Sequence, residues 1–159
     1  IIVKRGKTRL EIICRPITES EFEQAMAIRI RVFVEEQHVP IQEERDHLDA
    51  TAQHFGAFVD GQMVGTGRIV SLDKQAKLGR IAVLPEYRGR HIGFKLVEHM
   101  VQWARNKGFR EAVLGAQVQA IGFYERLGFK AEGDVFDDAG IPHRTMRLAL
   151  AERDEKRWF

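Results

Sequence analysis

The stretch that decides the fold is "IAVLPEYRGRHIGFKLVEHM", residues 81–100, which reads as a strand, a turn and the start of a helix. Pro85 stops the strand, and from about Arg88 to Lys107 apolar residues recur at the spacing of an amphipathic helix. Glycines and arginines gather where this helix begins. The dipole of a helix already places positive charge at its start, so the added cations raise the question of what lies against them.

The residues at this helix start suit a phosphate. The first backbone N–H groups of a helix have no internal partners, and together with the dipole they attract anions. Gly89 and Gly93 would let a bulky phosphate approach the backbone, while Arg88 and Arg90 add charged contacts. Neither a P-loop nor a dinucleotide fingerprint is present. On these residues alone, a pyrophosphate site and a plain helix entry with solvent-facing arginines are equally good explanations.

Composition limits the class of protein. The chain has 159 residues, of which 44% are hydrophobic and 30% charged, and this predicts one soluble globular domain over residues 1–159. A net charge of +2 does not suggest a nucleic-acid partner. No apolar run approaches the roughly 20 residues that span a bilayer, and a single cysteine favours a cytoplasmic protein. The charged tail, residues 151–159, is expected to fray.

The rest of the chain alternates between strand and helix patterns. Thr18 and Glu21 form a capping-box pattern before a helix that should run to about Glu36, and Asp60-Gly61 marks a hairpin turn. The order predicts an α/β (α+β) domain with a mixed central sheet flanked by helices. The other expected elements are strands at 10–17, 78–84, 111–116 and 144–150, a polar loop at 37–50 and a short helix at 119–127.

Three blocks of sequence resemble a known family. Residues 81–100 resemble the acetyl-CoA-binding motif of the GNAT superfamily of N-acetyltransferases, in which [QR]-x-x-G-x-[GA] follows a strand ending in V-x-P. His91 stands in place of the usual middle glycine. "FYERLGF" (123–129) resembles a later motif of the superfamily. "EEQHVP" (35–40) and "DAGIPHRTM" (138–146) resemble the ElaA-like and YjcF-like branch, and "GIPH" also resembles glyphosate N-acetyltransferase.

The resemblance implies acetyl-CoA as cosubstrate, and no residue spacing predicts a metal site. In the GNAT fold the central strand is bulged and splays from its neighbour, so its free backbone can pair with the amides of pantetheine, while the loop holds the diphosphate. An ordinary core strand is the alternative for residues 81–83. The implied cofactor-binding residues are Ile81, Ala82, Val83, Arg88, Gly89, Arg90, His91, Ile92 and Gly93.

Two side chains are candidates for proton transfer. The resemblance implies that Tyr124 is the general acid for the departing thiolate, against the alternative of an aromatic residue that only packs on the sheet. His143 matches the histidine of "GIPH" and is the candidate base, since imidazole titrates near neutral pH. A hydrogen-bonding loop histidine, with water as the base, is the alternative. Arg29, Arg31 and Arg80 are candidates to bind the acceptor, or else are solvated arginines.

These residues predict an enzyme that transfers the acetyl group of acetyl-CoA to a primary amine, which we expect to be a small molecule, by direct attack in a ternary complex. The rivals are a non-catalytic CoA-binding or sensing protein on the same fold and a generic nucleotide-binding domain. The identity of the amine stays open. Many relatives pair, so a homodimer is a further expectation.

Overall fold

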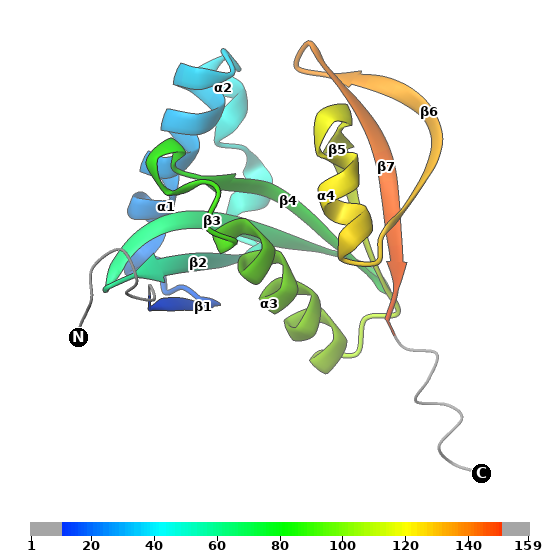
Figure 1. Cartoon of the computed structure of the whole chain (residues 1–159), viewed down its shortest axis with the longest axis horizontal. Helices are drawn as coiled ribbons and strands as arrows, with labels where there is room; N and C mark the ends of the chain where they lie inside the picture. The colour runs from blue at the N-terminus through cyan, green and yellow to red at the C-terminus, as the bar shows by residue number, and fades with distance from the viewer. Residues whose placement is uncertain (1–10, 151–159) are drawn as a thin grey trace.

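The computed structural model describes residues 11–150, which form one seven-stranded sheet with helices on both faces (Figure 1). The strands are β1 (Ile12–Pro16), β2 (Gln53–Val59), β3 (Gln62–Leu72), β4 (Gln75–Val83), β5 (Glu111–Gln117), β6 (Lys130–Asp138) and β7 (Ile141–Ala149). The α-helices are α1 (Phe22–Arg29), α2 (Ile41–Glu44), α3 (Ile92–Asn106) and α4 (Ile121–Arg126). A π-helix, η3 (Ile30–Glu36), continues α1, and short 3₁₀ turns are η2 (Glu19–Glu21), η4 (His47–Ala50), η5 (Pro85–Tyr87) and η6 (Val118–Ala120).

The strands lie in the order β1-β2-β3-β4-β5-β7-β6. Every neighbouring pair is antiparallel except β4 and β5, which are parallel. The predicted hairpin joins β2 to β3, with φ of 50° at Asp60 and 84° at Gly61, the positive values that a tight two-residue turn needs. The predicted mixed sheet flanked by helices is therefore confirmed.

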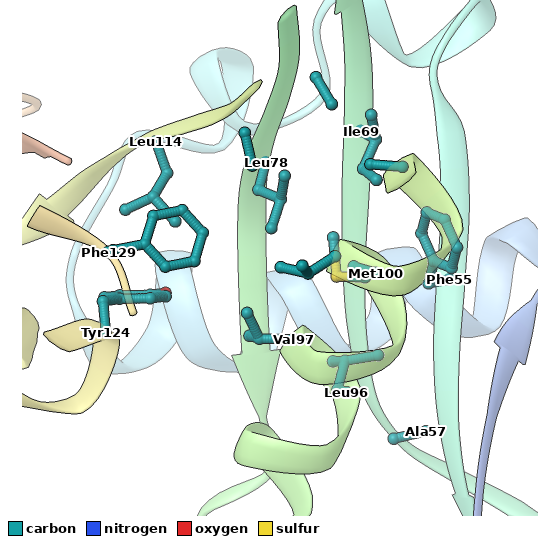
Figure 2. Close-up of a cluster of buried hydrophobic side chains, with 14 of the residues drawn as sticks. Phe55, Ala57, Ile69, Leu78, Leu96, Val97, Met100, Leu114, Tyr124 and Phe129 are labelled. Carbon is teal, nitrogen blue, oxygen red and sulfur yellow. The ribbon is translucent and has the colours of Figure 1, made fainter. Parts of the chain in front are cut away.

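Helices divide the sheet into two faces, with α3 and α4 in front and α1 behind in Figure 1. We call these the α3 face and the α1 face. On the α3 face, Leu96, Val97 and Met100 of α3 lie in the main core together with Phe55 and Leu78 (Figure 2). The smaller core of the α1 face consists of Ala25, Ile28, Val32, Phe58, Met63 and Ala82. No helix within residues 11–150 has the length and apolar character to cross a membrane.

One strand, β6, was not predicted from the sequence. It forms an edge of the sheet, and most of its residues are exposed on both sides, so it lacks the apolar alternation that reveals a half-buried strand. The turn into β7 places Ala139 and Gly140 at positive φ. Its pairing partner β7 begins at Ile141, three residues earlier than the predicted strand at 144–150.

The prediction of a polar loop at 37–50 was wrong, because this segment contains α2 and η4. Asp46 caps η4 by accepting a hydrogen bond from the backbone of Leu48 at 3.1 Å. Glu44, which reads as a solvent-facing carboxylate, is only 2% exposed. The predicted helix does reach Glu36, although its second half is the π-helix η3. The predicted fraying of 151–159 lies outside the described residues.

Candidate active site

An opening in the centre of the sheet separates β4 from β5. Their parallel pairing stops after three residue pairs, the last of which joins Lys77 to Val113. Beyond this point β4 pairs only with β3, as far as Val83, and β5 pairs only with β7, as far as Gln117. A cavity of about 1330 Å³ lies in the opening. The inner edges of both strands therefore offer backbone groups to a ligand.

A β-bulge bends β4 beside this opening. Thr66 of β3 faces Ala82, whereas Arg68 faces Gly79, so β4 contains one more residue than β3 over this interval. Arg80, the residue after Gly79, has a left-handed φ of 52°. A bulge bends its strand and redirects side chains, and here both Gly79 and Arg80 border the cavity. The family resemblance implied both the bulge and the divergence.

The loop after β4 leaves backbone donors free at the start of α3. The first helical hydrogen bond joins Lys95 N to His91 O at 3.0 Å. Within residues 11–150, the preceding backbone N–H groups of Ile92, Gly93 and Phe94 have no backbone acceptor, as expected for a first helical turn. The same three residues border the cavity. The predicted anion site therefore has the free donors that it needs.

The conformation of His91 explains why the family motif has a glycine there. Its φ of 63° and ψ of 15° lie in the left-handed region, which glycine enters freely and other residues at a cost of about 1–2 kcal/mol. The His91 side chain is exposed and makes no capping hydrogen bond. Gly93 differs, because a Cβ there would lie 3.6 Å from Val83, an ordinary contact. His91 thus keeps the shape of the loop at a cost in stability.

The two arginines of the loop take different positions. Arg88 donates from Nε to the Val83 carbonyl at 2.9 Å and from both Nη atoms to Glu36 at 2.8 Å, and these hydrogen bonds lower the pKa of Glu36. Arg90 instead lies over the ring of Tyr87, 5.5 Å from its centroid, and does not border the cavity. The predicted cofactor residues that do border it are Ile81, Ala82, Val83, Arg88, Gly89, His91, Ile92 and Gly93.

Tyr124 projects from α4 into the same cavity. Its ring packs edge-to-face on Phe129, with centroids 5.9 Å apart, and its oxygen points away from α4 toward α3 (Figure 2). Burial raises the pKa of Tyr124 to about 12. The hydroxyl has no hydrogen-bond partner within residues 11–150, yet it is not among the fully enclosed polar atoms, so it keeps access to the cavity.

His143 of β7 borders the cavity from the α1 face and is 9% exposed. Its Nδ1 lies 2.6 Å from the carbonyl oxygen of Ile141. Because a carbonyl can only accept, Nδ1 must carry the hydrogen, which leaves a lone pair on Nε2. The ring also stacks on Phe136 at 5.8 Å and 24°, and Gly115 opposite leaves room for both rings. His143 is therefore held in the tautomer that can accept a proton.

A cluster of arginines and carboxylates lies on the α1 face. Arg29 donates from Nε to Glu44 and from Nη1 to Asp49, both at 2.8 Å. Burial alone would raise the pKa of Asp49, but the hydrogen bonds and charges of Arg29, with a further hydrogen bond from Arg68, outweigh it and hold the pKa at about 2. The formal charges of the cluster balance, since its members are Arg29, Arg68, Arg80, Glu44, Asp46 and Asp49.

The three arginines predicted to bind an acceptor are not brought together at the cavity. Arg29 is only 1% exposed, and Arg31 forms an exposed pair with Glu86; neither borders the cavity. Arg80 does border it, with Nη2 donating to Asp46 at 3.0 Å. Within residues 11–150, no group of three or more His, Cys, Asp or Glu side chains is arranged to hold a metal ion.

Among the uncharged cavity residues that sequence reasoning missed are Gly79, Gln37 and Gln117. Gly79 has nothing within 4 Å of the place where a Cβ would stand, and Gln37 and Gln117 join across the opening through a hydrogen bond of 3.0 Å. All three border the cavity. Gln37 belongs to "EEQHVP", so that block was the one available signal.

Comparison with known proteins agrees with this geometry. A model of the acetyltransferase (GNAT) family matches residues 17–129. The chain is 36% identical over 129 residues to the uncharacterized N-acetyltransferase YjcF of Bacillus subtilis, covering 80% of this chain and 92% of YjcF. Among solved structures, an acyl-CoA N-acyltransferase from Pseudomonas aeruginosa matches with a TM-score of 0.77 and 31% identity, covering 89% of this chain and 100% of that one.

ElaA of Escherichia coli matches with a TM-score of 0.76 and 25% identity, covering 88% of this chain and 99% of its own. The two named relatives confirm the ElaA-like and YjcF-like branch that the sequence blocks indicated. The family model covers more than half of the chain. The chain therefore belongs to the acetyltransferase (GNAT) family.

Proposed function

We propose that this protein transfers the acetyl group of acetyl-CoA to the primary amine of a small molecule. The observation that carries the proposal is one continuous cavity. It is bordered by the free amides at the start of α3, by the unpaired edge of β4, and by Tyr124 and His143. A cosubstrate with a diphosphate, a chain of amides and a thioester matches these groups in turn.

The residues present fit coenzyme A. The backbone N–H groups of residues 92–94 would hold the diphosphate, and the inner edge of β4 would pair with the pantetheine amides as an added strand does. Acetyl-CoA supplies a thioester whose carbonyl carbon is open to attack. A backbone N–H of β4 would stabilise the oxygen as it gains charge, a contribution of about 2.7–4 kcal/mol for one such donor.

His143 would take the proton of the attacking amine. The new C–N bond forms as Nε2 accepts this proton, because Nδ1 is committed to the Ile141 carbonyl. General base catalysis of this kind contributes about 10²–10⁴-fold. The ring cannot turn freely, since Phe136 stacks on it. The proton of the amine would therefore be taken up on the α1 face of the sheet, and the acceptor would approach from that side.

Tyr124 would give a proton to the sulfur as the C–S bond breaks. A phenol with a pKa of about 12 stays protonated at neutral pH. The phenol therefore has a proton to give to the thiolate that forms as the bond breaks, which is the role of a general acid.

The direct test is thiol release from acetyl-CoA across a panel of amines. We expect turnover, and we expect Tyr124→Phe to lower kcat by about 10²–10⁴-fold with little change in CoA affinity. Tyr87→Phe is the comparison variant, because that phenol borders the same cavity but lies under Arg90 rather than on α4. Tight CoA binding without turnover of any amine would contradict the proposal and favour a CoA-sensing protein. Unchanged turnover in Tyr124→Phe would remove this residue from the mechanism.

A further inference from the structure

Two glutamine side chains, those of Gln37 and Gln117, form a bridge across the opening between β4 and β5. Gln117 Nε2 donates to Gln37 Oε1 at 3.0 Å, and Gln119 Nε2 donates to Gln117 Oε1 at 2.6 Å. Gln37 follows directly after η3, and Gln117 is the last residue of β5. The hydrogen bond between Gln37 and Gln117 therefore connects the helical layer of the α1 face to β5, and it joins residues that are 80 positions apart in the sequence.

The fold fixes the position of Gln37. The backbone N–H of Gln37 donates to Val32 O at 3.1 Å, the five-residue spacing of a π-helix, and such π-turns occur frequently at functional sites. His38 then ends the helix with a left-handed φ of 65°. Glu36, the preceding residue, is held by Arg88. Gln37 is thus a fixed part of the cavity wall.

Gln117 lies beside the candidate base. It is the direct partner of His143 in the β5–β7 register, and side chains of opposite residues in an antiparallel pair lie on the same face, with Cβ atoms about 4.5–5.5 Å apart. Ala116 points into the main core, so Gln117 points to the α1 face. The bridge therefore lies where an amine must come to reach His143.

Two arginines near this position already have carboxylate partners. Arg80 pairs with Asp46, and Arg147 pairs with Glu111. An acceptor carboxylate would find no uncompensated arginine among these pairs. Gln37 Nε2, in contrast, has no hydrogen-bond partner within residues 11–150, and a primary amide has two hydrogens to donate. The bridge therefore offers an uncharged donor to the cavity.

We propose, on the basis of the proposed function, that Gln37 and Gln117 recognise the acceptor. Gln117 holds the Gln37 amide in place, and Gln37 Nε2 donates to an uncharged carbonyl oxygen of the acceptor. The acceptor class is therefore an amine with a neighbouring amide carbonyl, as in an amino-acid amide. A site that hydrogen-bonds its substrate discriminates strongly against an analogue that lacks the bonding group.

The experiment compares glycinamide with isobutylamine, which has the same shape but no carbonyl or amide. The readout is the ratio of their kcat/KM values, in which effects common to both amines cancel. Gln37→Met removes both donor and acceptor of the amide. Gln37→Glu keeps an oxygen for Gln117 Nε2 but removes the free donor. Gln102→Met, on the exposed side of α3, is the control.

We expect the ratio to fall at least about tenfold in both Gln37 variants and to stay unchanged in Gln102→Met. A loss in Gln37→Met with no loss in Gln37→Glu would show that the bridge is only structural and would overturn the proposal, as would an unchanged ratio in every variant. If the unmodified protein acetylates neither amine, nor any other, the proposed function fails and this inference fails with it. Failure of this inference alone can be told apart from failure of the proposed function, because in the former case the unmodified protein still acetylates an amine.

Discussion

The arginines of the α1 face and those of the loop after β4 differ in what surrounds them. Arg29, 1% exposed, is paired with buried carboxylates in a charge-balanced cluster. Arg88 is exposed and paired with Glu36, and the backbone amides that follow it are free. Arginines alone therefore do not mark an anion site. Donors without partners are what an anion needs, and here the backbone of the loop provides them.

The same contrast separates stability from ligand binding. In the α1-face cluster, Arg29 holds the segment 44–49 to α1, whereas Arg68 and Arg80 hold it to strands β3 and β4. In the loop, the left-handed residues Gly89 and His91 shape the chain before α3, whose first residues, 92–94, border the cavity. One region is expected to respond to mutation with a loss of folding, and the other with a loss of ligand.

The largest expected effect is on the buried cluster. Arg29→Met removes one of the two arginine partners of each of Glu44 and Asp49, which keep Arg80 and Arg68 respectively. Breaking a buried pair costs about 3–5 kcal/mol. Urea unfolding measures the loss. Arg31→Met, which removes a similar but exposed pair with Glu86, should change the unfolding free energy little. Equal small losses in both variants would contradict the structural role of the cluster.

A smaller effect should distinguish the part of the cavity proposed to receive the acceptor from the loop after β4 that is proposed to bind CoA. Gly79→Leu places a side chain in open space within the cavity, so kcat/KM for the amine should fall at least about tenfold while the Kd for CoA stays unchanged. Gly122→Leu fills open space on α4 that does not border the cavity and serves as the control. Weaker CoA binding in Gly79→Leu, with an unchanged kcat/KM for the amine, would show instead that Gly79 borders the part of the cavity that binds CoA.

The smallest effect concerns the strained residue of the loop. His91→Gly relieves a left-handed conformation and should raise the unfolding free energy by up to about 1 kcal/mol, since glycine also loses more freedom on folding. CoA affinity should not change. His47→Gly, at an ordinary position in η4, should lower stability by about 0.5–1 kcal/mol. A loss of stability in His91→Gly would show that the histidine makes a stabilising contact.

The sequence predicted most of the fold because its strands and helices have local signals. The capping box at Thr18 and Glu21 is present, as are the hairpin at Asp60-Gly61 and the strand, turn and helix around Pro85. The edge strand β6 was missed because neither of its sides is buried. The segment 37–50 was misread because pairing with arginines distant in sequence decides whether its carboxylates are buried.

For the candidate site, the sequence located the groups that belong to motifs. Tyr124, His143 and the loop at residues 88–93 were identified from blocks with recognisable order, and all but Arg90 of these border the cavity. The bridge between Gln37 and Gln117 could not be foreseen, because a hydrogen bond across 80 residues leaves no local pattern. The same is true of Gly79, whose importance depends on the space around it.

The central claim is that free amides at the start of α3, and not the arginines of the α1 face, hold the diphosphate of coenzyme A. ¹⁵N-resolved NMR titration with CoA observes both regions at once, since it reports backbone amides and arginine Nε–H groups. The account predicts the largest shifts at the amides of residues 89–94, with little change at the Nε–H of Arg29 and Arg68. Large shifts at those arginines, with the loop amides unaffected, would contradict it.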